Sequence, residues 1–503
     1  MGGRFPRLKL TERAFCCHPQ TVAVVIGYCI YNLYFHPLRR YPGPKLWAMT
    51  RIPYTLNFHS GRGIFRIREL HQQYGPFVRL SPDSVSCSHP DAIHQLQGHR
   101  KGGKPENPKD DHVILQFKDD IVGVKSREEH SRLRRVMSHG FSAQAMLEQQ
   151  PLIKRYVDLL LQRLHERGDG GRTPLDVCKW YNWTTFDIIG DLAFGESFDN
   201  LETGNYHPWV SIIFESLVVM SKVTTLHRFE FIGKLLPGLL IPRAMNKKMQ
   251  EHNELSAMKV DKRLSSTEDR DRPDLIGKMV AGSEKHGNPL TRHELVHNAA
   301  VLITAGSETT AGLLCGATWL LAKHPHILSK LQNEIRSSFA SEDEIDLIST
   351  QNLKYLQACL DESLRYFPPA VGNLPRVIAP GGDFIIDRHV PEGTVLEVWQ
   401  WVINHNPAYF HKPDEFHPER WLGDEEFKND QLQGVNPFSV GPRNCIGKNL
   451  ANSEMRLIIA RIVWNFDFHL APGSEDWYDQ CLAYAVWQKP ALNVCFVPRE
   501  IKA

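Results

Sequence analysis

The stretch "NPFSVGPRNCIGKNLANSE", residues 436–454, places Cys445 in a glycine-rich turn directly ahead of a segment with helical spacing. Gly441 and Gly447 allow a tight backbone turn and the close approach of a flat ligand. Apolar residues recur at helical intervals over 451–466, so Cys445 would lie near a helix N-terminus, where free amides and the helix dipole favour a thiolate. Taken alone, the turn fits either a structural cysteine or a thiolate that binds a ligand.

The composition narrows the class of protein. A chain of 503 residues could form about three domains of ~150 residues or one large domain. Hydrophobic residues make up 42% and charged residues 23%, which is typical of a globular protein, and the net charge of +2 gives no strong field that favours nucleic acid. The ten cysteines include no CxxC pair, which argues against zinc ribbons and a disulfide framework. We find no repeat and no long linker after Pro44, so one large domain is expected.

The N-terminal segment differs from the rest of the chain. No Asp, Glu, Lys or Arg occurs over residues 14–38, and the apolar stretch 22–35 would span about 21 Å as a helix, against about 30 Å for the hydrocarbon core of a membrane. If the helix also included the uncharged residues from Ala14 onwards, it could cross the membrane. The segment therefore predicts a membrane anchor over residues 1–38, with a buried or interfacial helix, or a cleaved signal peptide, as alternatives. Basic residues flank the apolar segment on both sides, so the positive-inside rule does not predict the orientation of the anchor in the membrane.

The clearest predicted helix is "LTRHELVHNAAVLITAGSETTAGLLCGATWLLAKHP", residues 290–325. Thr291 and Glu294 form a capping-box pattern, and Pro325 ends the run. The sequence is almost wholly apolar over 299–322, so this helix should be buried on nearly all sides. A second helix is expected over 352–366. Alternation and a turn over 383–399 predict a small sheet, so the chain should be mainly α with a small β part.

"AGSETT", residues 305–310, interrupts the apolar helix with polar groups. A carboxylate such as Glu308 is costly in apolar surroundings unless it has a partner or a task. Ala305 leaves room beside the helix, and Thr309 could open the helix locally by bonding to its own backbone. The pattern fits either a packing notch with satisfied polar groups or a reactive site.

"DESLRYFPP", residues 361–369, places Glu362 and Arg365 on one helix face. On its own such a pair is typical of a weak surface salt bridge. The downstream stretch "FHPERWL" adds Arg420, which could complete a buried ion-pair network.

These stretches together resemble the cytochromes P-450. "FSVGPRNCIG", residues 438–447, is similar to the haem-binding signature of that family, with Phe, Gly, a basic residue, Cys and Gly at its spacings. Glu362, Arg365 and Arg420 resemble its ExxR pair and downstream arginine, and "AGSETT" resembles its oxygen-activation motif. The resemblance runs along nearly the whole chain and implies a mainly α fold with a long central helix over haem. Short stretches elsewhere in the sequence are similar to those of fungal microsomal enzymes of secondary metabolism.

The resemblance also implies roles for individual residues. Cys445 would be the axial thiolate and metal ligand of haem b, Phe438 would shield its sulfur, and Gly441 and Gly447 would give the porphyrin room. The groups expected to hold the haem propionates are His130, Arg134, Arg376 and Arg443. Glu362, Arg365 and Arg420 would hold the haem-binding core together. Thr309 would hydrogen-bond dioxygen and Glu308 would help to supply protons to it.

The resemblance implies a monooxygenase that inserts one oxygen atom from O2 into a lipophilic small molecule, such as a terpenoid or polyketide, in a fungal biosynthetic pathway. The expected substrate pocket consists of Phe117, Ile121, Val301, Ala305, Val371, Leu374 and Tyr484. No G-x-G-x-x-G or flavin segment appears, so electrons would come from a partner NADPH-cytochrome reductase. Residues 1–38 would anchor the protein in the endoplasmic reticulum membrane, with a haem-thiolate catalytic domain over 39–503 facing the cytosol.

Three alternatives remain from the sequence. The enzyme could be a desaturase or epoxidase, it could rearrange peroxides without a reductase, or it could be a non-catalytic haem or lipid-binding protein. The intact Glu308–Thr309 pair favours oxygen activation over the last two.

Overall fold

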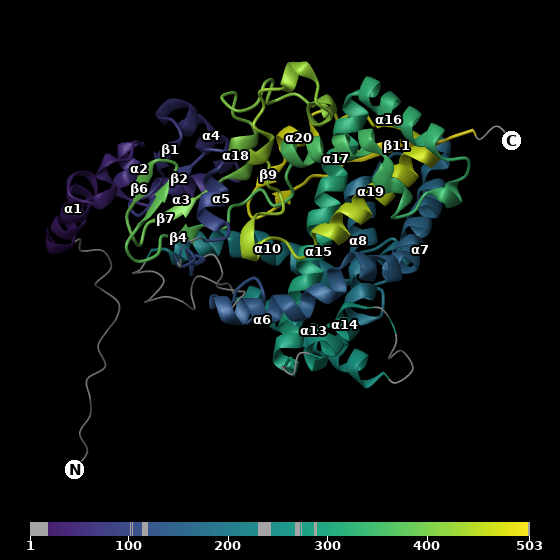
Figure 1. Cartoon of the computed structure of the whole chain (residues 1–503), viewed down its shortest axis with the longest axis horizontal. Coiled ribbons are helices and arrows are strands. Elements are labelled where there is room, and N and C mark those ends of the chain that lie inside the picture. The colour runs from purple at the N-terminus through teal and green to yellow at the C-terminus, as the bar shows by residue number, and fades with distance from the viewer. Residues whose placement is uncertain are drawn as a thin grey trace, which may run out of the picture.

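The computed structural model describes residues 19–100, 102, 104–112, 119–229, 243–266, 272, 274–285 and 289–500. Helices make up most of the molecule, and the small sheets lie partly beside the N-terminal helices and partly towards the C-terminal end (Figure 1). This arrangement confirms the expected mainly α architecture with a small β part.

The described α-helices vary in length from a single turn to 32 residues. They are α1 (Pro19–Tyr34), α2 (Lys45–Met49), α3 (Ile52–His59), α4 (Gly63–Tyr74), α5 (Ala92–Gln97), α6 (Arg127–Ser138), α7 (Ala143–Gly168), α8 (Val177–Phe194), α9 (Asn200–Thr203), α10 (Pro208–His227), α13 (Arg243–Ser265), α14 (Leu275–Lys285), α15 (Arg292–Lys323), α16 (Pro325–Ser338), α17 (Lys354–Tyr366), α18 (Gln400–Asn404), α19 (Lys448–Asn465) and α20 (Trp477–Gln480).

The described strands form small sheets. They are β1 (Phe77–Arg79), β2 (Ser84–Cys87), β3 (Leu175–Asp176), β4 (Arg376–Val377), β5 (Asp383–Ile385), β6 (Arg388–Val390), β7 (Val395–Glu397), β8 (Phe466–Leu470), β9 (Leu482–Ala483), β10 (Trp487–Gln488) and β11 (Asn493–Pro498). One sheet has the order β1-β2-β7-β4, with β2 and β7 parallel, and another has the order β3-β11-β8. The predicted sheet over 383–399 is therefore divided: β5 and β6 form a hairpin, whereas β7 joins the sheet of β1 and β2.

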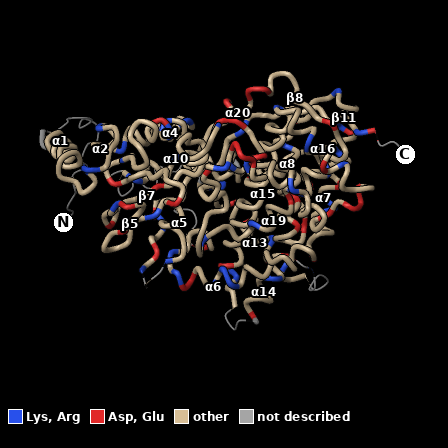
Figure 2. Tube along the Cα trace, turned by 45° about the horizontal axis from the view of Figure 1, so that its top comes forward, with Lys and Arg blue, Asp and Glu red and all other residues tan. Residues whose placement is uncertain are grey.

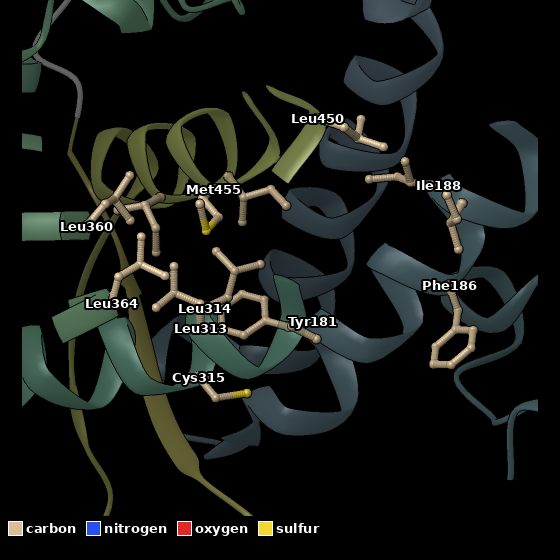
Figure 3. Close-up of a cluster of buried hydrophobic side chains, with 14 of the residues drawn as sticks. Tyr181, Phe186, Ile188, Leu313, Leu314, Cys315, Leu360, Leu364, Leu450 and Met455 are labelled. Atoms are coloured by element: carbon tan, nitrogen blue, oxygen red, sulfur yellow. The ribbon is translucent and has the colours of Figure 1, made fainter. Parts of the chain in front are cut away.

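The core is built around α15. Its first turn carries the expected capping box, in which Thr291 and Glu294 satisfy each other's backbone amides. Its 32 residues span about 48 Å, and it packs along α8 and against α13, α17 and α19. Buried side chains from three of these helices meet in Figure 3: Leu313 and Leu314 of α15, Leu360 and Leu364 of α17, and Leu450 and Met455 of α19. Each such buried leucine contributes about 1.5–3 kcal/mol of transfer free energy.

The N-terminal helix α1 presents an apolar surface to solvent. Val24 is 71% exposed and Phe35, just beyond the helix, 65%. Its C-terminal end is fastened to the body, because Asn32 donates to the Met49 carbonyl and Arg79 donates to the Asn32 carbonyl. Among the described residues, α10 and α15 are long and apolar enough to cross a membrane by length and composition, whereas the apolar part of α1, Val22–Tyr34, is shorter. Most of the apolar window of α15 is buried, however, so α15 is a core helix.

A buried ion-pair network joins α17 to the irregular segment that precedes Cys445. Arg365 donates from Nε and Nη2 to the two carboxylate oxygens of Glu362, each at 2.9 Å, and its Nη groups also donate to the carbonyls of Asn404, Pro413 and Glu415. All three charged side chains of the network, Glu362, Arg365 and Arg420, are essentially inaccessible to solvent. The expected network is therefore present.

Further donors complete the network around Glu362. Arg420 lies with Nε 3.3 Å from Glu362 Oε2 and also pairs with Asp430, and Trp421 Nε1 donates to Glu362 Oε2 at 2.9 Å. Burial alone would raise the pKa of Glu362, but Arg365 and Arg420 hold that pKa below its ordinary value. The carboxylate is therefore ionised in the folded protein.

We predict that Glu362→Gln lowers the free energy of unfolding by about 3–5 kcal/mol, because the buried Arg365 guanidinium loses its charge partner and Arg420 loses one of its two. Urea unfolding followed by circular dichroism would measure this change. Since the folded pKa of Glu362 is depressed, its stabilisation is present above the unfolded pKa and is lost as the pH falls, so the difference between protein and variant should narrow below a pH of about 4. The matched control is Glu425→Gln, which removes an exposed salt bridge with Lys428 and should cost less than about 1 kcal/mol. Equal losses in the two variants would contradict the prediction.

Candidate functional site

The loop that carries Cys445 is closed by its own backbone. The Cys445 amide donates to the Phe438 carbonyl at 2.8 Å, across a short 3₁₀ turn at Gly441–Arg443. Gly441 has φ +76°, and a Cβ there would lie 2.1 Å from the Gln97 carbonyl oxygen at the end of α5. Gly441 therefore permits a backbone turn close to α5, in line with the tight turn expected there. A Cβ at Gly447 would make only ordinary contacts, 3.9 Å from Phe141 and 4.0 Å from the Cys445 sulfur.

The thiol of Cys445 is exposed, yet the surrounding protein removes it far enough from bulk solvent to raise its pKa. The Gly447 amide, Arg134 and Lys448 act in the opposite direction, as expected near the start of α19, but they do not outweigh burial. A metal ion at the sulfur would supply the remaining stabilisation, because a coordinating thiol is deprotonated by the metal's own charge. The site thus suits a metal-bound thiolate better than a free one.

Two arginines hold the Cys445 loop against its neighbours. Arg134 of α6 donates to the carbonyl and the side-chain oxygen of Asn444 at 2.5 and 2.7 Å. Arg443 donates to the carbonyls of Val124 and Lys125, each at 2.7 Å, and pairs with a carboxylate in the preceding segment. The loop is therefore attached to α6 and to the chain just before it. The arginine-rich α6 contributes blue segments at the edge of the molecule in Figure 2.

Buried cations gather next to this loop. Lys109, His130 and Arg376 are each less than a tenth exposed, and an isolated β-bridge pairs Lys109 with Arg376. Burial, reinforced by Arg376 and Arg443, lowers the pKa of Lys109 to about 7. Burial, reinforced by Arg443 and Lys109, lowers the pKa of His130 to about 3. Burial is the main cause of both shifts, and the neighbouring positive charges add to it, so an anionic group beside these basic side chains would be favoured.

Lys109 was missed by sequence reasoning. It lies in the charged stretch "ENPKDD", where no periodicity or motif distinguishes one lysine. Only its contacts identify it, namely the bridge to Arg376 and the hydrogen bond from its ammonium group to the Val122 carbonyl. The nearby carboxylates Glu106 and Asp120 offset part of the cluster's charge.

The "AGSETT" stretch forms a polar patch in the middle of α15. Thr309 donates its hydroxyl to the Ala305 carbonyl at 2.7 Å, and Ala305 itself is exposed although most of the helix is buried. Glu308 forms an ion pair with Lys489, and both side chains are almost fully buried. The second carboxylate oxygen of Glu308 has no hydrogen-bond partner among the described residues. Nothing in the sequence around Lys489 predicts this ion pair with Glu308.

The patch on α15 lies close to α19. Thr310, next to Thr309, hydrogen-bonds Glu454 of α19, whose pKa is raised by burial to about 8. Cys445 lies nine positions before Glu454 and just ahead of α19, so the helix that follows the cysteine loop also contacts the polar patch.

Comparison with known proteins gives the family. Residues 42–496 match the family model described as cytochrome P450. The chain belongs to the cytochrome P450 family. It is 50% identical over 479 residues to the trichothecene C-15 hydroxylase of Fusarium sporotrichioides, which covers 95% of this chain and 96% of the relative. It is 43% identical over 478 residues to an averantin hydroxylase of Dothistroma septosporum (94% and 89%), and 41% identical over 493 residues to a P450 monooxygenase of Talaromyces stipitatus (95% and 94%).

These relatives make this P450 an oxidoreductase of the monooxygenase class, and they place it among fungal enzymes of biosynthetic pathways. Membership also implies a haem iron bound by a cysteine thiolate, a small-molecule substrate, O2 and a redox partner. The residues present fit that group: a soft sulfur ligand is exposed in a clamped loop, and a cluster of buried cations beside it lacks enough anionic partners.

A pocket of this P450 lies among α10, α13 and α15. Its lining residues are Asp120, Ile212, Ile213, Ser216, Leu217, Met249, His252, Asn253, His297, Ala300, Val301 and Thr304. Val301 was expected there, and Ile121 follows directly on Asp120. The contributions of α10 and α13 were missed, because the sequence does not show which face of either helix turns towards α15.

The remaining predicted pocket residues have other positions. Phe117 lies outside the described residues. Val371 is buried and Leu374 is 47% exposed, and neither is among the described residues that line this pocket. Tyr484 is buried, with its ring 6.2 Å from that of Phe58 and beneath Lys222, and it is not among the described residues that line this pocket.

We predict that Lys109→Gln accelerates haem loss from this P450 several-fold, because the variant removes one buried cation from the cluster that faces the Cys445 loop. Transfer of haem to an excess of apomyoglobin, followed by absorbance, would measure the rate. Lys104→Gln is the matched control, since Lys104 is a neighbouring lysine whose side chain is 62% exposed. Equal rates of haem loss in the two variants would show that Lys109 does not contribute to holding the cofactor.

Proposed function

We propose that this P450 binds haem b through the Cys445 thiolate and hydroxylates a lipophilic small molecule in a fungal biosynthetic pathway. The observation that carries the proposal is the exposed Cys445 thiol, in a loop clamped by Arg134 and Arg443 beside buried cations. Hydroxylation is the preferred outcome because two similar relatives are named hydroxylases. Phe438 is proposed to cover the sulfur. Epoxidation or desaturation is the alternative outcome on the same site.

The propionates of the haem are proposed to bind the cationic cluster. Lys109, His130 and Arg376 are buried and electrostatically unfavourable together, and carboxylates would relieve that repulsion. Arg134 and Arg443 border the same region, with their guanidinium groups already engaged by the Cys445 loop and its neighbours. When bound, the haem supplies dioxygen activation, which the axial thiolate favours by donating electron density to the iron.

Proton supply is proposed to depend on Glu308 and Thr309. The Glu308 carboxylate is oriented by Lys489, while its other oxygen lacks a partner among the described residues. The Thr309 hydroxyl donates to Ala305, so its oxygen remains able to accept a hydrogen bond. The surrounding apolar stretch of α15 excludes water, which confines protons to these groups.

The substrate is proposed to be a largely apolar molecule with a few polar groups, such as a terpenoid or polyketide. The pocket offers Ile212, Leu217 and Val301 as apolar contacts, with Ser216 and Asn253 as hydrogen-bonding groups. By their names, the relatives act on a trichothecene and on averantin, which supports a substrate of comparable character.

The electron donor is proposed to be an NADPH-cytochrome reductase. Arg135 and Lys448 are exposed on the Cys445 side of the molecule and offer a basic surface to an acidic partner. Residues 1–38 are proposed to anchor a catalytic domain over 39–503 to the endoplasmic reticulum membrane with that domain in the cytosol. The exposed apolar surface of α1 supports a membrane contact.

We expect the reduced protein with carbon monoxide to give the long-wavelength Soret band of thiolate-ligated haem, and Cys445→Ser to lose that band. With NADPH, a reductase and a pathway extract as substrate source, we expect a product that carries one atom of ¹⁸O from labelled O2. Mass spectrometry would detect it. A product formed from an organic hydroperoxide without reductase would favour the peroxide-rearranging alternative. A bound thiolate-ligated haem without turnover would favour the non-catalytic one.

We predict that Lys489→Gln moves the alkaline limb of the kcat–pH profile to higher pH by at least about one unit. Burial raises the pKa of Glu308 and Lys489 lowers it, so the pKa rises further when the ammonium group is removed. A carboxyl group that supplies protons acts in its protonated form, and the variant keeps that form up to a higher pH. Lys489→Arg retains the positive charge and should restore the profile. An unchanged limb in Lys489→Gln would contradict a role for Glu308 in proton supply.

A further inference from the structure

The start of α15 carries the sequence "HELVH", residues 293–297. His293 and His297 are four residues apart and therefore share one face of the helix. Their ring centroids are 4.2 Å apart. A His-Glu-x-x-His pattern on a helix is an arrangement whose two imidazoles bind zinc in metalloproteases.

A third donor reaches the same place from a different segment. Asp119 precedes α6 in the chain, and its carboxylate lies 4.0 Å from His293 Nε2. One donor atom from each of Asp119, His293 and His297 lies within 4.8 Å of the others. Tetrahedral ligands about 2.1 Å from zinc lie roughly 3.4 Å apart, so small side-chain rotations at this exposed surface would close the site.

The backbone holds Asp119 near the helix. The Ile121 amide donates to Asn298 Oδ1 of α15 at 3.0 Å. Asp120 Oδ1 accepts from the amides of Val122 and Gly123 at 2.8 and 2.9 Å, which shapes the turn that follows Asp119. The turn of residues 119–124 is thus docked on α15 before any ion binds.

The chemistry of the three donors decides which ion the cluster would bind. Two imidazoles and one carboxylate, with a further position open to water, match the preferences of zinc better than those of magnesium or calcium.

Glu294, the middle residue of the pattern, is already engaged. Its carboxylate accepts from the Thr291 amide at 2.8 Å and pairs with Arg132 of α6. In a metalloprotease the equivalent glutamate must act as a general base. Because Glu294 is committed to the helix cap and to Arg132, the cluster has ligands for a metal and no free base for hydrolysis.

We propose that Asp119, His293 and His297 form a surface site for zinc that fastens the turn 119–124 to α15. His297 and Asp120 also line the pocket among α10, α13 and α15, so the ion lies at the rim of that pocket. Zinc bound there restrains the movement of the turn away from the helix. The site thus slows the entry of ligands to the pocket in a zinc-dependent way, independently of the haem chemistry.

The test uses the tag-free holoenzyme after treatment with a chelator. Calorimetric titration with zinc should show one ion bound per chain at this site, and titration with magnesium should show none. His297→Ala and Asp119→Asn should each weaken zinc binding at least about tenfold. The matched control is His326→Ala, which removes an exposed histidine near the start of α16. Zinc affinity that is equal in His297→Ala and the holoenzyme would overturn the site.

A second measurement tests the proposed restraint. Zinc should slow amide hydrogen exchange in residues 121–124 of the holoenzyme, and it should have no such effect in His297→Ala. Exchange that does not respond to zinc in a holoenzyme that binds it would overturn the fastening of the turn. Because both readouts are independent of turnover, they remain decisive whatever substrate the P450 oxidises.

Discussion

The carboxylate of Glu362, neutralised by two buried arginines, is the interaction on which the site depends. Arg365 lies on the same helix and fixes the carboxylate, while its remaining donors take up carbonyls of the irregular segment after α18. Arg420 reaches the carboxylate from that segment itself. A long stretch without regular structure thereby acquires hydrogen bonds that neighbouring strands or helices would otherwise provide. The Cys445 loop begins where this stretch ends, so its position derives from the network.

Charge is buried in this P450 in two different ways. In the Glu362 network and the Glu308–Lys489 pair, opposite charges compensate each other inside the protein. Around Lys109 and His130, basic side chains lie together, and burial, reinforced by neighbouring positive charges, lowers their pKa values. The first arrangement stabilises the folded chain by itself. The cluster around Lys109 and His130 lowers the stability of the folded chain, and an anionic partner such as a haem propionate would remove that loss.

The sequence was sufficient for the fold class, for α15 with its capping box, and for Glu362, Arg365 and Arg420. These features depend on local spacing or on motifs with a fixed order along the chain, and both can be recognised in the amino-acid sequence alone. Lys109 and Lys489 were not found, because each matters through one contact with a distant segment. The pocket was found only in part, since Val301 follows from its place on α15 whereas the faces of α10 and α13 are set by packing. The tight turn at Gly441 was predicted, but its close approach to α5 was not, because no spacing in the sequence indicates a contact with a distant helix.

The contact between Gly441 and the end of α5 has a mechanical consequence. The Gln97 carbonyl occupies the space that a methyl group would need, so the cysteine loop and α5 cannot move towards or past each other. Helix α5 belongs to the part of the molecule that contains the small sheets, because it packs against β5. The loop that carries the sulfur is therefore positioned by α5 as well as by α19. A displacement of α5 towards the loop would be opposed by steric contact at Gly441, where no space for a methyl group remains.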